Sequence, residues 1–225
     1  RPGRLDRQIS IDIPDLKARE LILKIHCQNG EFKKPLAEDV DLSVVAKWTE
    51  MHSGAKLEAV ANEAAFMALR AGRDDIGMKE FDEAIDRVSW GPLKKSREMS
   101  GEDLKRVAFH EAGHTYIARL LGTAIRKVTI LPRANAGGYT GLVAEANQMT
   151  RANLKYFTDM LVILFGGKAG ELIGCGDSCI GDHSDRTMAT NIARRMICEF
   201  GMSERLGKAV ISERSAFLGV SSGNL

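Results

Sequence analysis

The chain has 225 residues, of which 44% are hydrophobic and 28% charged, and its formal net charge is +2. This length suffices for one large or two modest cores, and the composition excludes collagen-like, low-complexity and disordered classes. No run of like charge forms a nucleic-acid-binding stripe, so we expect no nucleic-acid partner. Four cysteines are too few for a disulfide framework, which is typical of a reducing compartment.

Neither end of the chain carries a recognisable targeting signal. The sequence opens with Arg-Pro-Gly-Arg, with no initiator methionine and no signal peptide, so we expect a piece of a longer protein. The longest apolar run, residues 160–165, is far shorter than the ~20 residues that cross a bilayer. We therefore expect this segment not to span a membrane.

The first ninety residues predict one strand followed by four helices. Polar and apolar residues alternate over 8–13, which is the period of a half-buried strand. Asp15 then caps a helix in which Leu21, Ile22 and Ile25 recur at helical spacing. The four predicted helices span residues 16–27, 41–51, 55–71 and 79–90.

Residues 91–100 (GPLKKSREMS) combine Gly, Pro and a basic cluster between two helical patterns, so we place a domain boundary there. Beyond it the predicted helices span 100–121, 151–173 and 184–200, and the predicted strands span 126–131 and 139–145. The expected fold class is mainly α with a small β-sheet.

The sharpest motif is HEAGH at residues 110–114, inside a predicted helix. At 3.6 residues per turn His110 and His114 project from one face, so both imidazoles can reach one zinc ion. Glu111 lies beside them, placed to take a proton from water. The composition predicts only about 0.008 chance occurrences of H-E-x-x-H, which favours a site over two solvated histidines. Gly113, unfavourable in a helix interior, indicates a close approach by another element.

A catalytic zinc needs a third protein ligand, and the candidates lie in the loop from 174 to 185. Asp185 starts a helix, so it is either a ligand or a plain capping carboxylate. His183 is a second candidate. Cys175 and Cys179 with His183 form a competing set that suits a structural zinc, although a closed structural site needs four ligands.

Together these motifs resemble FtsH-type membrane-anchored ATP-dependent zinc metalloproteases of the AAA protease group. The resemblance covers essentially the whole chain and rests on RPGRLDRQ, HEAGH, KVTILPRANAGGYT, FGGKAGE and GDHSDRTMAT, in that order. It implies three parts: the end of the AAA large subdomain over 1–14, the helical AAA lid over 15–92, and a C-terminally truncated zinc metalloprotease domain over 99–225.

The resemblance also implies individual roles. His110, His114 and Asp185 correspond to the zinc ligands, and Glu111 to the catalytic base. A further set corresponds to nucleotide-contacting positions and to two arginine fingers that act on a neighbouring subunit: Ile22, His26, Gly54 and Ala55 for the nucleotide, and Arg1 and Arg4 for the fingers.

The function implied is an ATP-dependent zinc metalloendopeptidase that degrades membrane and misfolded soluble proteins by attack of zinc-activated water. Its cofactors would be Zn²⁺ and, in the full-length protein, ATP with Mg²⁺. The resemblance further implies a homo- or hetero-hexameric ring, anchored in a bacterial inner or organelle membrane by an N-terminal segment outside this chain, so that the fragment itself is soluble. The alternative is a non-proteolytic, chaperone-like AAA unfoldase subunit, which the intact HEAGH disfavours.

The chain departs from the family pattern at several places, among them Ala134, Gly137 and Leu172, and two further departures lie beside expected site residues. Where the family reads GFSGADL, residues 51–57 read MHSGAKL, so that Met51 and His52 replace Gly and Phe. Near the expected third ligand, Asp182 and His183 add potential metal ligands that the family's TGASND lacks. The residues that correspond to the zinc ligands are all present.

Overall fold

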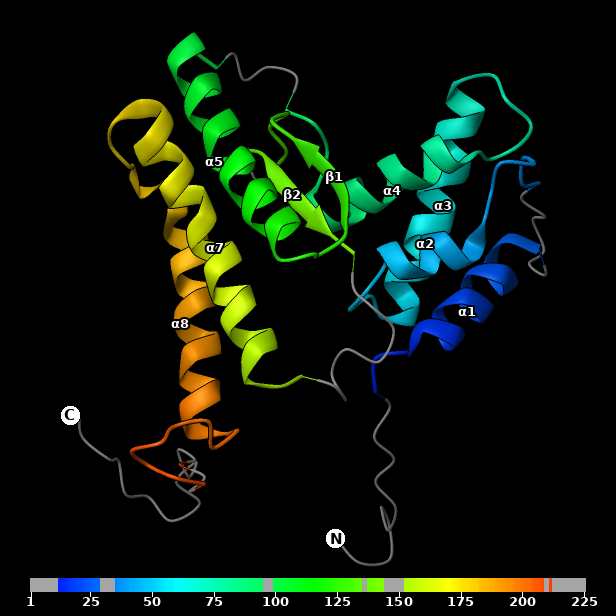
Figure 1. Cartoon of the computed structure of the whole chain (residues 1–225). Coiled ribbons are helices and arrows are strands. Elements are labelled where there is room, and N and C mark those ends of the chain that lie inside the picture. The colour runs from blue at the N-terminus through cyan, green and yellow to red at the C-terminus, as the bar shows by residue number, and fades with distance from the viewer. Residues whose placement is uncertain are drawn as a thin grey trace, which may run out of the picture. The chain divides into compact units, whose positions relative to one another are not determined.

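The structure is a computed structural model that describes residues 12–28, 35–94, 99–134, 137–143, 152–208 and 211. These residues are mainly helical, as the sequence predicted, with one two-stranded antiparallel sheet among them (Figure 1). They fall into two units: described residues within 1–100 and 124–148 form the first, and those within 101–123 and 149–225 form the second. Residues 8–11 of the strand predicted over 8–13, and Arg1 and Arg4, lie outside the described residues, and residues 12 and 13 are not in a strand.

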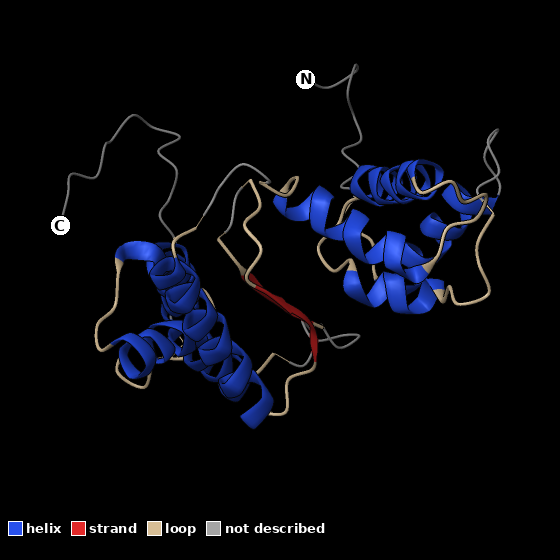
Figure 2. Ribbon diagram, turned by 90° about the horizontal axis from the view of Figure 1, so that it is seen from above, coloured by secondary structure: helices blue, strands red, loops and turns tan. Residues whose placement is uncertain are grey.

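Four helices of the first unit pack around one apolar core. Figure 2 shows the helical ribbons of the chain from above. Their bounds are α1 Leu16–Gln28, α2 Leu42–Trp48, α3 Gly54–Arg70 and α4 Met78–Trp90. Each predicted helix is confirmed with ends shifted by at most three residues. Asp15 accepts a hydrogen bond from the backbone N–H of Ala18 at 2.8 Å, which confirms its capping role.

The predicted apolar stripe of α1 is wrong at two of its three residues. Leu21 and Ile25 are more than half exposed, whereas Ile22 packs against the core in which Leu23 and Cys27 are buried. The reason is Arg19, one turn before Leu23, whose guanidinium Nε donates to the backbone carbonyl of Ala46 on α2 at 3.0 Å. This buried polar contact fixes the helix so that the i, i+4, i+8 stripe through Arg19 turns inward.

The sheet is a hairpin of β1 (Ile125–Thr129) and β2 (Tyr139–Leu142), shorter than predicted at the ends of both strands. It packs on α4: the ring of Tyr139 stacks on Trp90 with centroids 5.4 Å apart. The sequence assigned these strands to the second part of the chain, but they belong to the first compact unit. The division into three parts at residues 1–14, 15–92 and 99–225 stays a prediction.

A buried ionic cluster holds the hairpin to α4. At its centre Asp86 is completely buried and accepts hydrogen bonds from Arg126 at 2.5 Å, Lys127 at 2.9 Å and Arg133 at 3.2 Å, and from the hydroxyl of Tyr139. Burial alone would raise the pKa of Asp86, but the hydrogen bonds from its cationic and hydroxyl neighbours outweigh it and lower the pKa below its usual value. The carboxylate is thus fully charged and compensated.

The described residues of the second unit form three α-helices and a short 3₁₀ turn. These elements are α5 Gly101–Leu120, α7 Leu154–Cys175, η1 Ile180–Asp182 and α8 His183–Cys198. Helix α7 begins three residues later than predicted, because Asn153 takes the N-cap position and its side chain accepts a hydrogen bond from the N–H of Tyr156 at 2.9 Å.

Helices α5 and α7 approach each other along glycines. A Cβ atom placed on Gly113 of α5 would overlap the carbonyl oxygen of Gly166 on α7 and lie 2.8 Å from its carbonyl carbon. One turn further along α7, a Cβ on Gly170 would overlap the carbonyl oxygen of Phe109. The prediction that Gly113 marks a close approach is confirmed.

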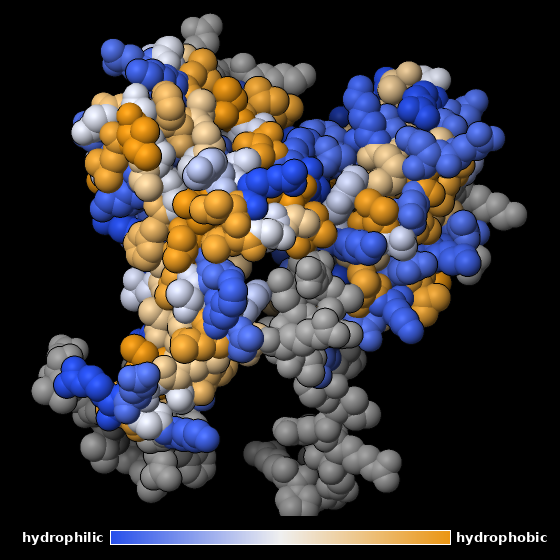
Figure 3. All heavy atoms as spheres, in the orientation of Figure 1, coloured by the Kyte–Doolittle hydropathy of each residue, from blue (hydrophilic) through white to orange (hydrophobic). Residues whose placement is uncertain are grey.

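The surface of the second unit also carries hydrophobic side chains (Figure 3), among which Ile173 and Ile180 are the most exposed. In the part of the chain that the structure describes, none of the helices combines the length and hydropathy that a membrane crossing demands.

Met51, which replaces the family's glycine, has a left-handed backbone with φ of 60°. A side chain there costs about 1–2 kcal/mol, partly offset by the greater chain entropy that glycine adds to the unfolded state. We expect Met51→Gly to stabilise the protein by about 0.5–1 kcal/mol, measured as a higher midpoint of thermal unfolding. Met51→Ala keeps the Cβ atom and is the control. An equal gain in both variants would show that side-chain exposure, not backbone strain, is relieved.

Candidate metal centre

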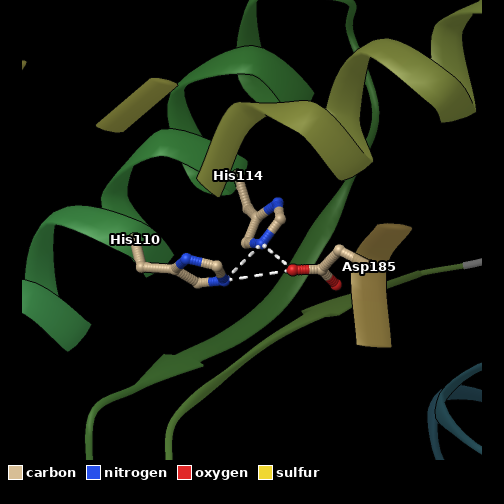
Figure 4. A group of neighbouring side chains, drawn as sticks. All are labelled: His110, His114 and Asp185. Carbon is tan, nitrogen blue, oxygen red and sulfur yellow. Dashed lines mark hydrogen bonds and ion pairs between the residues drawn. The ribbon is translucent and has the colours of Figure 1, made fainter. Parts of the chain in front are cut away.

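Three side chains from two helices converge on one point in the second unit (Figure 4). His110 and His114 lie one turn apart on α5, and Asp185 lies in the first turn of α8. Nε2 of His110 is 3.0 Å from Nε2 of His114 and 3.1 Å from Oδ2 of Asp185, and Nε2 of His114 is 3.3 Å from the same oxygen. The structure thus brings together the three residues that the sequence resemblance named.

This triangle has the dimensions of a tetrahedral zinc site. Ligand atoms at about 2.0–2.1 Å from a tetrahedral zinc ion lie about 3.3 Å from one another. The three observed separations, 3.0 to 3.3 Å, agree with that value. Two imidazole nitrogens and one carboxylate oxygen are donors that suit Zn²⁺, and three protein ligands leave the fourth position for water or substrate.

Both histidines are oriented for metal binding by a partner on their other nitrogen. Nδ1 of His110 is 2.8 Å from Oε1 of Glu171, and Nδ1 of His114 is 2.7 Å from the backbone carbonyl oxygen of Ile163. Since a carboxylate and a carbonyl oxygen accept hydrogen bonds, each Nδ1 is the donor and carries a hydrogen. A neutral imidazole in that tautomer presents the lone pair of Nε2 to a cation.

The charge balance of the site also fits a cation. Burial alone would lower the pKa of His110, but hydrogen bonds to the carboxylates of Asp185 and Glu171 raise it to about 9. Burial would raise the pKa of Asp185, yet the two histidines lower it to about 2. The carboxylates thus stabilise a positive charge at the Nε2 atoms of the imidazoles. A divalent cation would bind at the same place.

Glu111 is buried, with 5% of its surface exposed, and follows His110 directly on α5. The sequence placed it beside the metal ligands as a proton acceptor, and the helix keeps it in that neighbourhood. Its role as a base stays a prediction.

Two residues with supporting roles were missed from the sequence. A Cβ atom on Gly167 of α7 would lie 2.5 Å from Nε2 of His114 and 2.7 Å from Nε2 of His110, so only glycine leaves room for both imidazoles. Glu171, one turn further along α7, holds His110. Both belong to the FGGKAGE segment, where two adjacent glycines in a helical pattern were the available signal.

The competing cysteine set does not assemble. Among the described residues, His110, His114 and Asp185 are the one group of three or more potential ligands that lie close enough to share an ion. His183 and Cys179 are exposed, and the thiol of Cys179 instead accepts a hydrogen bond from Gly181 N–H. Asp182, the other added carboxylate, is buried and pairs with Arg186 at 3.0 Å.

The residues expected at a nucleotide lie on two helices of the first unit. Ile22 and His26 are one turn apart on α1, while Gly54 and Ala55 begin α3. His52, which departs from the family pattern just before Gly54, has a structural role. It is buried and its Nε2 is 3.3 Å from the hydroxyl of Ser89. The nucleotide contacts themselves stay a prediction.

Comparison with known proteins gives two family matches. Residues 97–224 match peptidase family M41, and residues 39–83 match the AAA+ lid domain. Similar curated proteins include ATP-dependent zinc metalloprotease FtsH 1 of Thermoanaerobacter sp. (strain X514), 48% identical over 97% of this chain and 36% of the relative. The proteins named ATP-dependent zinc metalloprotease FtsH from Bacillus subtilis (strain 168) and Thermotoga maritima are 46% and 43% identical over 92% and 97% of this chain. The chain spans about a third of the length of these relatives.

Proposed function

Because the chain belongs to peptidase family M41, we propose that it supplies the proteolytic site and the ATPase lid of an ATP-dependent zinc metalloprotease. The reaction is hydrolysis of peptide bonds in protein substrates. The observation that carries this proposal is the triangle of two Nε2 atoms and one carboxylate oxygen, each imidazole being oriented by a hydrogen bond on its Nδ1.

In this proposal His110, His114 and Asp185 hold the metal, and Glu111 handles protons. A zinc ion bound there would act as a Lewis acid on the scissile carbonyl and lower the pKa of a water molecule. Glu111 accepts the proton from the attacking water and passes it to the amine of the leaving peptide. Glu171 and the carbonyl of Ile163 keep both imidazoles turned so that their Nε2 lone pairs face the reaction centre.

The whole protein would couple this site to ATP hydrolysis with Mg²⁺, a proposal that the names of the relatives support by calling those proteins ATP-dependent. Residues 1–14 and 15–92 would belong to the ATPase and residues 99–225 to the protease. Ile22, His26, Gly54 and Ala55 would contact the nucleotide, and Arg1 and Arg4 would reach the γ-phosphate on a neighbouring subunit of a homo- or hetero-hexameric ring. A membrane anchor elsewhere in the protein would bring membrane and misfolded soluble proteins to the site.

Zinc content tests the proposed site. We expect one zinc per chain in the full-length protein by elemental analysis, and loss of that zinc in His114→Ala and in Asp185→Ala. His183→Ala is the matched control: it removes an exposed imidazole two residues from Asp185 and is expected to keep its zinc. Zinc retained in Asp185→Ala would refute the third ligand, and a parent protein without zinc would refute the proposal.

A further inference from the structure

Arg106 forms a link that the proposed mechanism does not use. It lies on α5 one turn before His110, and its guanidinium reaches both α7 and the turn that follows α7. Nη2 donates to Oδ1 of Asp177 at 2.8 Å, and Nη1 donates to the backbone carbonyl of Asp177 at 3.2 Å and to Oε2 of Glu171 at 3.4 Å. One side chain thus joins the helix that carries two ligands to the segment that leads to the third.

Glu171 is the group through which Arg106 acts. Its side chain is 2% exposed, and each carboxylate oxygen has a defined task. Oε1 accepts from Nδ1 of His110, while Oε2 accepts from the backbone N–H of Cys179 at 2.9 Å and from Arg106. In the described part of the chain, no other Arg or Lys side chain is paired with Glu171. A buried carboxylate needs such compensation to stay ionised and in place.

The turn held by Arg106 leads directly to the third ligand. Gly176 ends α7 in a left-handed conformation with φ of 82°, Asp177 follows it, and Asp185 lies eight residues further on. Two bonds from one guanidinium to Asp177 fix the start of this segment, and the bond from Cys179 to Glu171 fixes its middle. The position of Asp185 relative to His110 therefore depends on contacts that Arg106 organises.

We propose that Arg106 is a positioning residue of the metal centre, which holds Glu171 against His110 and the 176–179 turn against α5. This proposal rests on the proposed function, since it takes the triangle to be a zinc site. Arg106 is bonded to none of the three ligands themselves, so its effect passes through Glu171 and the turn. Such outer partners of metal ligands change metal affinity by about 10–100-fold when they are removed.

The direction in which zinc affinity changes when Arg106 is replaced distinguishes a positioning role from charge repulsion alone. A guanidinium close to a metal site repels a divalent cation, so that losing only its charge would strengthen zinc binding. Losing its positioning role would weaken binding, because His110 and Asp185 would no longer be held at ligand distance. We expect the second effect to exceed the first, since the charge of Arg106 is already paired with Glu171 and Asp177.

The test compares zinc affinity, measured by competition with a chromophoric chelator, in the full-length parent, Arg106→Gln and Arg106→Lys. We expect about tenfold weaker binding in Arg106→Gln and a smaller loss in Arg106→Lys, because an ammonium cannot span both carboxylates as the guanidinium fork does. The visible absorption of the Co²⁺-loaded protein should change in Arg106→Gln, which a role in stability alone would not cause. Lys105→Gln, on the same helix and exposed, is the matched control and should match the parent.

Asp177→Asn guards against a folding defect at Arg106. It removes only the negative charge of the exposed carboxylate that pairs with the guanidinium, and we expect it to weaken zinc binding less than Arg106→Gln but measurably. Parent-like or tighter zinc binding in Arg106→Gln would overturn the positioning role while leaving the zinc site intact. Should Arg106→Gln fail to fold, parent-like binding in Arg106→Lys and Asp177→Asn would overturn it. A parent without zinc would instead refute the proposed function, and this inference with it.

Discussion

Replacing Glu111 by Gln is expected to lower the rate of peptide hydrolysis by the full-length protein about 1,000-fold while its zinc content stays unchanged. A positioned general base contributes about 10²–10⁴-fold to such a reaction, and the amide of Gln cannot accept the proton. Because Gln has nearly the same size, the buried position keeps its packing. The measurement is cleavage of an unstructured protein such as casein, with zinc determined on the same samples.

The matched control for this prediction is Glu102→Gln, at an exposed position in the first turn of the same helix. It makes the same chemical change nine residues before Glu111 in the chain and should keep the parent rate. If Glu111→Gln hydrolysed casein as fast as the parent, Glu111 would not be the base. An inactive variant that had also lost its zinc would show a role of Glu111 in metal binding instead.

Replacing Gly113 by Ala is expected to destabilise the second unit by about 2–3 kcal/mol. The new Cβ atom would collide with the backbone carbonyl of Gly166, and a backbone cannot rotate away as the end of a flexible side chain can. Overpacking of this kind costs about 1–3 kcal/mol or more, which exceeds the gain of about 1 kcal/mol that Ala brings to a helix. The midpoint of thermal unfolding, measured on the metal-free protein, should fall by about 10 °C.

Gly101→Ala on the same helix tests whether the collision is the cause. Gly101 has no atom within 4 Å of an added Cβ, so Ala should be neutral or slightly stabilising there. If both variants unfolded at the same temperature, α5 and α7 would be able to separate at no cost, and the glycine contact would have no part in stability. In that case Gly113 would need another explanation.

The sequence predicted what is local. Helical periodicity placed His110, Glu111 and His114 together, because residues i and i+4 share a face in any α-helix. Gly113 indicated a close neighbour because its cost in a helix interior needs a reason. Residue types and spacing also predicted every described α-helix and both strands, with ends shifted by a few residues, but not the short 3₁₀ helix η1.

What the sequence alone left open depends on contacts between distant segments. Asp185 lies 75 residues from His110, and only the resemblance separated it from His183 and the cysteines. Glu171 and Arg106 carry no motif that states their partners. On α1, Leu21 and Ile25 were wrongly expected to face the core, since the buried contact of Arg19 with Ala46 decides the orientation of the helix.

The attachment of the hairpin to α4 was unpredictable for a related reason. Asp82, Asp86, Arg126 and Lys127 look like surface charges in a sequence, because buried charges are rare and their partners lie about 40 residues away. Only their mutual neutralisation allows burial. The attachment of the hairpin to α4 therefore follows from charge pairing that no periodicity reveals.

The elements of the first unit are held together in two ways that respond differently to temperature: by an apolar core and by this ionic cluster. Helices α1 to α4 share an apolar core, and hydrophobic stabilisation per unit area levels off as temperature rises. The hairpin is held to α4 largely by Asp86 and its cations, and the cost of dehydrating charges falls on heating. The contact between the hairpin and α4 is thus the part of this unit whose stability we expect to fall least when the protein is warmed.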